Sequence, residues 1–330
     1  MGSEVLRALR NDGIGIRGGD RAESIDWHVA DLECEWILGD LHRKSNLEAM
    51  IEGAEAMIHC AGYRPSEGEE VLRAKRQGVE GLRAVLDTCL RFGLRKVVYV
   101  SAASTVQQSG GPPGEKEERE RSWDENSYYL PGSSGSSYAE VKAAMEAEVY
   151  RYISKGLPVT IVNPGFVLGP GDVNMENLGF LPELLQGRPR WFPRERTNVA
   201  DVRDVAGGVL GALKMGRPGR RYLLGGEEVE IEVLLKRCSE KLGREYLGTA
   251  VDPNLYGPIR QWDWWGPRSW GQRAGFRRRR GGTRDWLEVA KWSGSIESQR
   301  AEAEIGYRTR SMERTLDDMI RWIRQVGYLV

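Results

Sequence analysis

The stretch that decides the fold covers residues 136–172 and reads SSYAEVKAAMEAEVYRYISKGLPVTIVNPGFVLGPGD. Its first half, residues 138–154, places apolar residues at helical spacing and ends near Gly156. Its second half contains the apolar run 157–163, which predicts a buried strand closed by Pro164 and Gly165. A helix that leads directly into a buried strand is the repeating unit of a parallel α/β sheet.

The same alternation of helix and strand continues toward the N-terminus. The apolar periodicity predicts helices over 4–10, 45–52 and 78–92, and strands over 14–17, 34–38, 57–60 and 96–100. Ser45 and Glu48 form a candidate capping box for the second helix. This order predicts an α/β fold: a Rossmann-type, doubly wound parallel sheet covered on both faces. We expect a Rossmann domain over 1–165 and a smaller substrate lobe over 166–330, from which some segments return to the sheet.

The composition excludes several classes of protein. Lys plus Arg and Asp plus Glu each number 48, so the formal net charge is zero and gives no reason to expect binding to nucleic acid or to an anionic membrane. The four cysteines are widely spaced, which argues against a disulfide framework and a zinc site and fits a reduced, cytoplasmic setting. No apolar run approaches the ~20 residues that cross a bilayer. We expect no metal.

One region, within residues 248–295, is anomalous. Six of the eleven tryptophans fall between 257 and 292, without helical or strand periodicity, and four arginines fill positions 277–280. A platform for single-stranded nucleic acid is one interpretation, which the neutral net charge disfavours. An irregular surface loop is the second. The third, which we favour as a hypothesis, is that this composition reflects out-of-frame translation of GC-rich DNA.

Chemistry is suggested by the spacing Tyr138-x-x-x-Lys142. Four residues make about one helical turn, so both side chains lie on one face of the predicted helix. A neighbouring ammonium favours the phenolate and lowers the pKa of a tyrosine, which suits general acid–base work on a carbonyl or an alcohol. Such a pair also arises by chance on a polar helix surface, so the interpretation depends on the rest of the sequence.

The rest of the sequence supplies that context in ordered blocks. The blocks are Leu38-Gly39-Asp40-Leu41, Ile58-His59-Cys60-Ala61-Gly62, and the segments 95–101, 136–172, 198–206, 222–227 and 304–313. With these blocks the chain resembles the extended short-chain dehydrogenase/reductase family, in particular its NAD-dependent epimerase/dehydratase and dihydroflavonol-reductase-like members. The resemblance covers most of the chain except about 248–295. It implies an NAD(P)-dependent oxidoreductase or a sugar epimerase/dehydratase acting on a small carbonyl or alcohol substrate, without separating the two, and is compatible with a homodimer.

The resemblance also implies a cofactor site. The residues it places against the dinucleotide are Asp40, Leu41, Ala61, Gly62, Tyr138, Lys142 and Pro164. Tyr138 would transfer the proton, and Lys142 would hold the nicotinamide ribose. Arg17 and Arg21 lie near the end of the predicted second strand, with Asp20 between them. An acidic residue there would select NAD, whereas an arginine suits the 2′-phosphate of NADP, and NADP is favoured over NAD.

Three departures from the family pattern are evident. The first residues align with the helix that follows the family's glycine-rich turn, with Gly2 as its last glycine, so we expect the preceding strand and turn to be absent. The family's catalytic serine falls on Ala102, and Ser101 is a substitute only after a one-residue slip that reverses its side chain. The family's usual asparagine falls on Gly78. These departures motivate the alternative of a weak or inactive Rossmann-like binding protein, or the product of a truncated gene.

Overall fold

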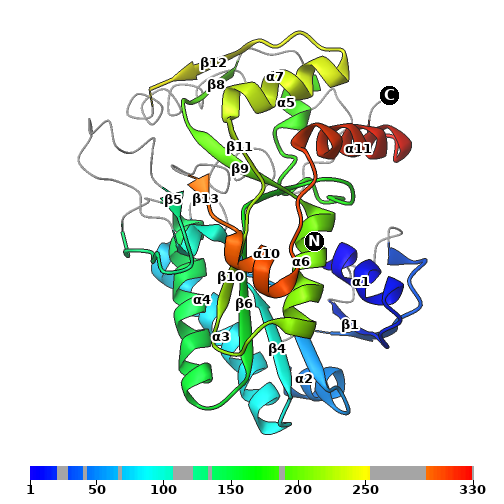
Figure 1. Cartoon of the computed structure of the whole chain (residues 1–330), viewed down its shortest axis with the longest axis vertical. Helices are drawn as coiled ribbons and strands as arrows, with labels where there is room; N and C mark the ends of the chain where they lie inside the picture. Colours follow the sequence, from blue (N-terminus) through cyan, green and yellow to red (C-terminus); the bar gives the residue numbers. More distant parts are fainter. Residues whose placement is uncertain are drawn as a thin grey trace.

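The computed structural model describes residues 1–20, 29–39, 43–65, 69–106, 122–132, 136–185, 190–252 and 295–328. Its centre is a sheet of four strands in the order β10-β6-β4-β3, and every neighbouring pair is parallel. These strands are β3 (Ala56–His59), β4 (Lys96–Val100), β6 (Val159–Pro164) and β10 (Arg221–Leu224). The structure therefore confirms the predicted parallel α/β sheet (Figure 1).

Helices cover both faces of this sheet because the side chains of a strand alternate between its faces. One face carries α2 (Lys44–Ile51), α3 (Val71–Arg91) and α4 (Ser137–Ser154). The other carries α1 (Gly2–Asn11), α6 (Val202–Met215) and α10 (Gln299–Ile305). In β4, Val97 and Tyr99 pack toward the first group, whereas Val98 and Val100 pack toward the second. Figure 1 shows α3 and α4 on one side of the strands and α6 and α1 on the other.

A separate parallel pair, β1 (Arg17–Asp20) and β2 (Glu35–Leu38), lies beside α1. The strand predicted over 14–17 overlaps β1 only at Arg17, so that boundary was wrong. The predicted capping box of α2 was also wrong, because its N-cap is Arg43 and no side chain caps it. Glu48 instead forms an ion pair with Arg91 of α3, with 2.8 Å between nitrogen and oxygen.

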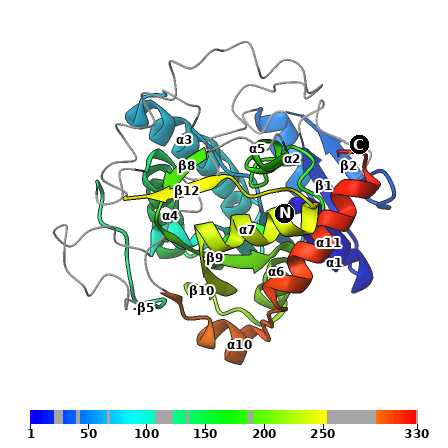
Figure 2. The ribbon, with the colours of Figure 1, turned by 90° about the horizontal axis from the view of Figure 1, so that it is seen from above.

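The second half of the chain builds a smaller layered lobe, seen from above in Figure 2. Its central sheet has the order β11-β9-β7, formed by β7 (Phe166–Leu168), β9 (Arg196–Asp201) and β11 (Glu227–Glu230). A further pair in the lobe is β8 (Arg190–Pro193) with β12 (Gly248–Val251). The pair of β5 (Ser122–Trp123) with β13 (Ser295–Ile296) instead lies beside β10, where Trp123 and Ile296 pack with Leu223. The helices of the lobe are α5 (Leu181–Leu185), α7 (Ile231–Leu242) and α11 (Met312–Gln325). The buried side chains of the lobe form one apolar core that includes Phe166, Phe180 and Phe192.

The lobe joins the main sheet at a tight crossing. The chain passes from β6 to β7 through Gly165, where an added Cβ would lie only 2.7 Å from the backbone oxygen of Asn198. The Asn198 side chain donates to the Gly226 oxygen at 3.2 Å and accepts from the Gly226 nitrogen at 2.6 Å. The Gly165 nitrogen donates to the Leu224 oxygen at 3.1 Å. The chain passes between sheet and lobe at Gly165 and again at Gly226, and these hydrogen bonds hold the two connections side by side.

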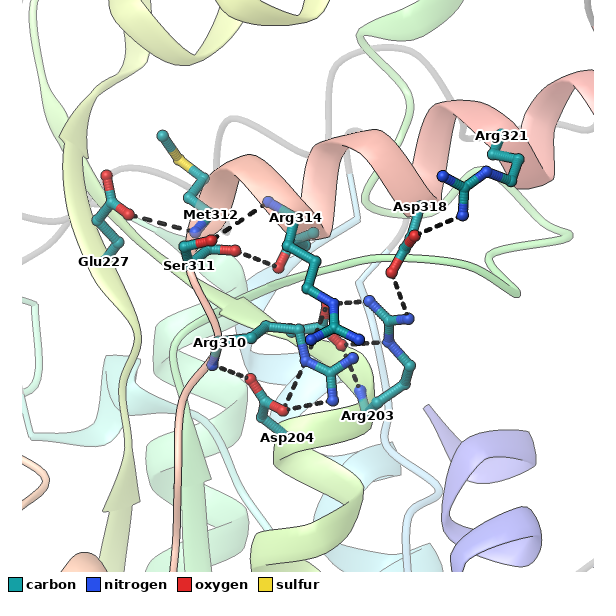
Figure 3. Close-up of polar contacts among 11 residues, drawn as sticks. Arg203, Asp204, Glu227, Arg310, Ser311, Met312, Arg314, Asp318 and Arg321 are labelled. Atoms are coloured by element: carbon teal, nitrogen blue, oxygen red, sulfur yellow. Dashed lines mark hydrogen bonds and ion pairs between the residues drawn. The ribbon is translucent and has the colours of Figure 1, made fainter.

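Charged side chains connect the start of α6 to the C-terminal segment (Figure 3). Asp201 caps α6 by accepting from the Arg203 nitrogen at 2.8 Å. Asp204 accepts from the backbone nitrogen and the Nε of Arg310 at 2.7 and 2.8 Å. Arg203 donates to Asp318 of α11 at 2.7 Å. Asp201 and Asp204 therefore act as a helix cap and as ion-pair partners.

Two predictions on the organisation of the chain stay untested. The tryptophan- and arginine-rich segment 257–292 lies outside the described residues. The division of the chain at residue 165 stays a prediction, although β10, α6 and α10 follow it in sequence and pack on the main sheet. Among the described helices, none is long and apolar enough to cross a bilayer.

A buried carboxylate fixes α4 against the strands. Glu146 is 3% exposed. Its Oε2 accepts from the hydroxyls of Ser101 and Thr105 and from the amide of Asn163, at 2.5, 2.6 and 2.8 Å. Arg221 donates to its Oε1 at 3.3 Å. Since a buried charge is tolerated only when it is paired and hydrogen-bonded, these contacts tie α4 to the ends of β4 and β6 and to β10.

We therefore expect Glu146→Ala to lower the free energy of unfolding by about 3–5 kcal/mol, because it removes the buried carboxylate that Ser101, Thr105 and Asn163 contact and leaves Arg221 with backbone acceptors alone. Glu146→Gln keeps the hydrogen-bonding shape and should cost less. Urea unfolding measures both. Glu55→Ala, at a site 85% exposed, is the matched control and should change stability by less than about 0.5 kcal/mol. Equal effects of E146A and E55A would refute this role.

Candidate active site

Helix α4 begins where it does because Ser136 caps it. The Ser136 hydroxyl accepts from the Ala139 nitrogen at 3.3 Å, which satisfies one of the free N–H groups of the first turn. Tyr138 therefore lies in that first turn, and Lys142 follows one turn later on the same helix. The predicted helical placement of the pair is confirmed.

Lys142 lies in a narrow space at the ends of β3 and β4. Its side chain is 6% exposed, and among the described residues only the Val100 oxygen accepts from it, at 3.5 Å. A Cβ added to Gly62 would lie 2.9 Å from the Lys142 Nζ, so a side chain at this position would displace the Lys142 ammonium. Burial, and secondarily the positive charge of Arg64, lower the pKa of Lys142 to about 8.

Tyr138 differs electrostatically from the expectation. Burial raises its pKa, because a phenolate is poorly solvated there, and the cation that opposes this rise is Arg64. The predicted lowering of its pKa by Lys142 is therefore wrong for the protein without ligand. The guanidinium carbon of Arg64 lies 5.7 Å from the centroid of the Tyr138 ring.

Arg64 is a site residue that the sequence interpretation missed. It donates to the Glu176 backbone oxygen at 3.2 Å and to the Asn177 Oδ1 at 3.1 Å. The turn that carries both is held by Asp172, whose carboxylate accepts from the backbone nitrogens of Glu176 and Asn177 at 3.0 and 2.9 Å. Arg64 thus bridges the end of β3 and the lobe. Its position two residues after Gly62 was the available signal.

Ser101 is placed differently from Tyr138 and Lys142. It is 4% exposed, and its hydroxyl donates to Glu146, one turn beyond Lys142. Ala102, which takes the family's serine position, is 8% exposed and offers no donor. The Ser101 hydroxyl is therefore used in the buried contact that holds α4.

The structure corrects the placement of Arg17. This residue begins β1, whereas ligands of such sheets bind beyond the carboxyl ends of the strands. Its Nε donates to Glu35 at 2.9 Å, and its NH1 donates to the backbone oxygens of Ala49 and Glu52 at 3.2 and 2.5 Å. Its charge therefore lies at the C-terminal end of α2, where it is favourable to the helix dipole. The role of Arg17 in cofactor binding stays a prediction.

The other predicted residues fall into two groups. Asp40 and Leu41 lie outside the described residues. Ala61 directly precedes Gly62 and is exposed, and Pro164 is the buried last residue of β6. Gly78 packs in α3 against Val141 and Met145 of α4.

The N-terminal end of α1 lies at the same edge of the sheet. A Cβ added to Gly2 would lie 3.9 Å from the Cβ of Cys60, directly after β3. The first N–H groups of a helix have no partner within it and carry a partial positive charge, which favours a phosphate. The first turn of α1, the Gly62 cradle and the underpartnered ammonium of Lys142 therefore fit a nicotinamide dinucleotide.

Comparison with known proteins extends this picture. The model of the NAD dependent epimerase/dehydratase family matches residues 1–225. Sterol demethylase protein B of Methylococcus capsulatus is 29% identical over 77% of this chain and 75% of its own length. A putative dihydroflavonol 4-reductase of Synechocystis is 24% identical over 100% of this chain and 93% of its own.

The solved structures agree on the fold. The UDP-glucose 4-epimerase of Thermus thermophilus in complex with NAD superposes with a TM-score of 0.72 at 19% identity, over 99% of this chain and 96% of that one. With the family match over most of the chain, and with the parallel sheet and helix α4 in place, the protein belongs to the NAD-dependent epimerase/dehydratase family, within the extended short-chain dehydrogenases/reductases.

Proposed function

We propose that the protein is an NAD(P)-dependent oxidoreductase that reduces a carbonyl on a small substrate, with Tyr138 as the proton donor. The observation that carries this proposal is the buried ammonium of Lys142, held in the Gly62 cradle one helical turn after Tyr138. The putative dihydroflavonol 4-reductase reported above supports a reductase over a sugar epimerase, since the epimerase likeness concerns the fold alone.

The chain's own residues would divide the work as follows. A bound nicotinamide dinucleotide supplies the hydride. Tyr138, whose pKa is raised, stays protonated at neutral pH and is therefore ready to donate its proton to the carbonyl oxygen of the substrate. Lys142 would donate to the ribose hydroxyls through an ammonium that has few partners in the protein. In the reverse direction the Tyr138 oxygen accepts the proton of the alcohol.

For the cofactor we propose NAD. The case for NADP depended on Arg17 and Arg21. Arg21 lies outside the described residues, and the Arg17 guanidinium donates to Glu35 and to the end of α2. The matched family is described as NAD dependent, which supports NAD.

The alternative is a catalytically weak or inactive relative. Ala102 favours it, because no hydroxyl at that position can polarise the substrate carbonyl, and Ser101 is engaged with Glu146. The two hypotheses differ in turnover and agree on cofactor binding.

We expect Tyr138→Phe to lower kcat about 10²- to 10⁴-fold without changing the affinity for NADH, because it removes only the transferable proton. The measurement is NADH oxidation with a panel of ketones, alongside a fluorescence titration of NADH. Tyr150→Phe, on the same helix and 40% exposed, is the control and should retain full activity. Wild-type protein that binds NADH but turns over no ketone would favour the inactive alternative.

We expect Gly62→Val to weaken NADH binding at least about tenfold, because its side chain would occupy the space of the Lys142 ammonium, 2.9 Å from the added Cβ. Gly207→Ala, where an added Cβ meets nothing within 4 Å, is the matched control. Fluorescence titration with NADH and NADPH measures the dissociation constants of both variants and of the wild type. Failure of the wild-type protein to bind either at millimolar concentration would count against the proposed function.

We expect Lys142→Met to stabilise the protein without ligand by on the order of 1–3 kcal/mol at pH 7, because the buried ammonium is costly. The pKa of Lys142 falls from 10.5 to about 8 on folding. Below pH 8 the lysine is charged in both the folded and the unfolded protein, so the full free-energy cost of burying the ammonium is present. Between pH 8 and 10.5 the folded protein releases the proton first and the cost fades, so the advantage of K142M should shrink there. Thermal unfolding across pH measures this, and a K142M variant less stable than wild type at pH 7 would contradict it.

A further inference from the structure

Arg64 lies against the Tyr138 ring, and its ion pair among the described residues, with Glu176, is long and exposed. We propose that Arg64 binds a carboxylate of the substrate, so that the substrate is an acid with an apolar body. This inference rests on the proposed function in that the reacting oxygen is placed at Tyr138.

The first argument is the set of partners of Arg64. Its two hydrogen bonds go to neutral acceptors, the Glu176 backbone oxygen and the Asn177 side-chain oxygen. The carboxylate of Glu176 lies 3.9 Å away and is 62% exposed, which is a weak surface ion pair. A guanidinium has five N–H donors, and the contacts of the described residues use two of them. Its charge and its planar fork remain suited to a carboxylate.

The second argument is the field around Tyr138. Lys142 is the other cation, and Arg64 lowers its pKa, which shows that the two charges repel each other. An anion between them would relieve this repulsion. The substrate would bring that anion, and the carbonyl would reach Tyr138 beside it.

The third argument is the apolar wall. Tyr138 and Met175 both pack against the apolar core of the lobe, and Met175 directly precedes the two residues that hold Arg64. A ligand that reaches Arg64 and Tyr138 therefore meets hydrocarbon on the lobe side. This favours a carboxylate on an apolar body over a strongly polar sugar.

The test compares an acid with its neutral ester. Isothermal titration measures binding of 3-hydroxydecanoate and of its methyl ester to the full chain, with and without NADH. The variants are Arg64→Gln, Arg64→Lys and, as the matched control, Arg95→Gln, whose side chain is 85% exposed on the surface. We expect wild type and R95Q to bind the acid at least about tenfold more tightly than the ester. R64Q should lose this preference, and R64K should keep part of it.

Turnover supplies the second readout. With NADH, the KM for 3-oxodecanoate should rise at least about tenfold in R64Q, and the KM for its methyl ester should rise much less. Three results would overturn the inference. Wild type could bind acid and ester equally. R64Q could weaken both equally, which would assign Arg64 to holding the turn at Glu176. R64Q could weaken NADH instead, which would assign it to a cofactor phosphate.

The experiment also separates this inference from the proposed function. If the acid binds in an Arg64-dependent way but neither NADH binding nor ketone reduction occurs, the carboxylate site stands and the oxidoreductase proposal falls. If ketones are reduced without any preference for the acid, the reverse holds.

Discussion

The hydrogen bonds of one buried carboxylate fix the geometry on which the site depends. Glu146 stands one turn beyond Lys142, which itself stands one turn beyond Tyr138, so all three share a face of α4. Because Glu146 is held by groups at the ends of β4 and β6 and by Arg221 of β10, this face cannot rotate or slide along the sheet without losing several buried contacts. The contacts of Glu146 thus fix the positions of Lys142 and Tyr138 on the same face of α4.

The sequence predicts the parts of the fold that follow from local periodicity. The strand over 96–100 and the helix over 138–154 agree with β4 and α4 within one residue at each end, because an apolar run or a serine cap marks their limits. The prediction from periodicity fails at β1, because its sequence Arg-Gly-Gly-Asp carries none of the residue types that strands favour. The isoleucines at 14 and 16 therefore drew the prediction too early and carried Arg17 to the wrong end of the strand.

The site divides in the same way. Tyr138, Lys142 and Gly62 are visible from spacing and from residue type. The roles of Arg64 and Glu146 do not follow from local spacing, because they arise from tertiary contacts, with Asn177 for Arg64 and with Ser101 and Arg221 for Glu146. Ser101 shows why proximity in sequence is insufficient: a single residue of register decides whether a hydroxyl faces the substrate or the neighbouring helix.

The crossing at Gly165 has a consequence for how this architecture can diversify. Two adjacent connections of the chain join the lobe to the sheet, and hydrogen bonds of Asn198, Gly226 and Leu224 hold them. A body held at two points resists swinging, so the distance from the lobe's apolar wall to Tyr138 behaves as a fixed dimension. New substrate preferences must then arise by exchanging individual side chains on that wall, while the lobe keeps its position relative to the sheet.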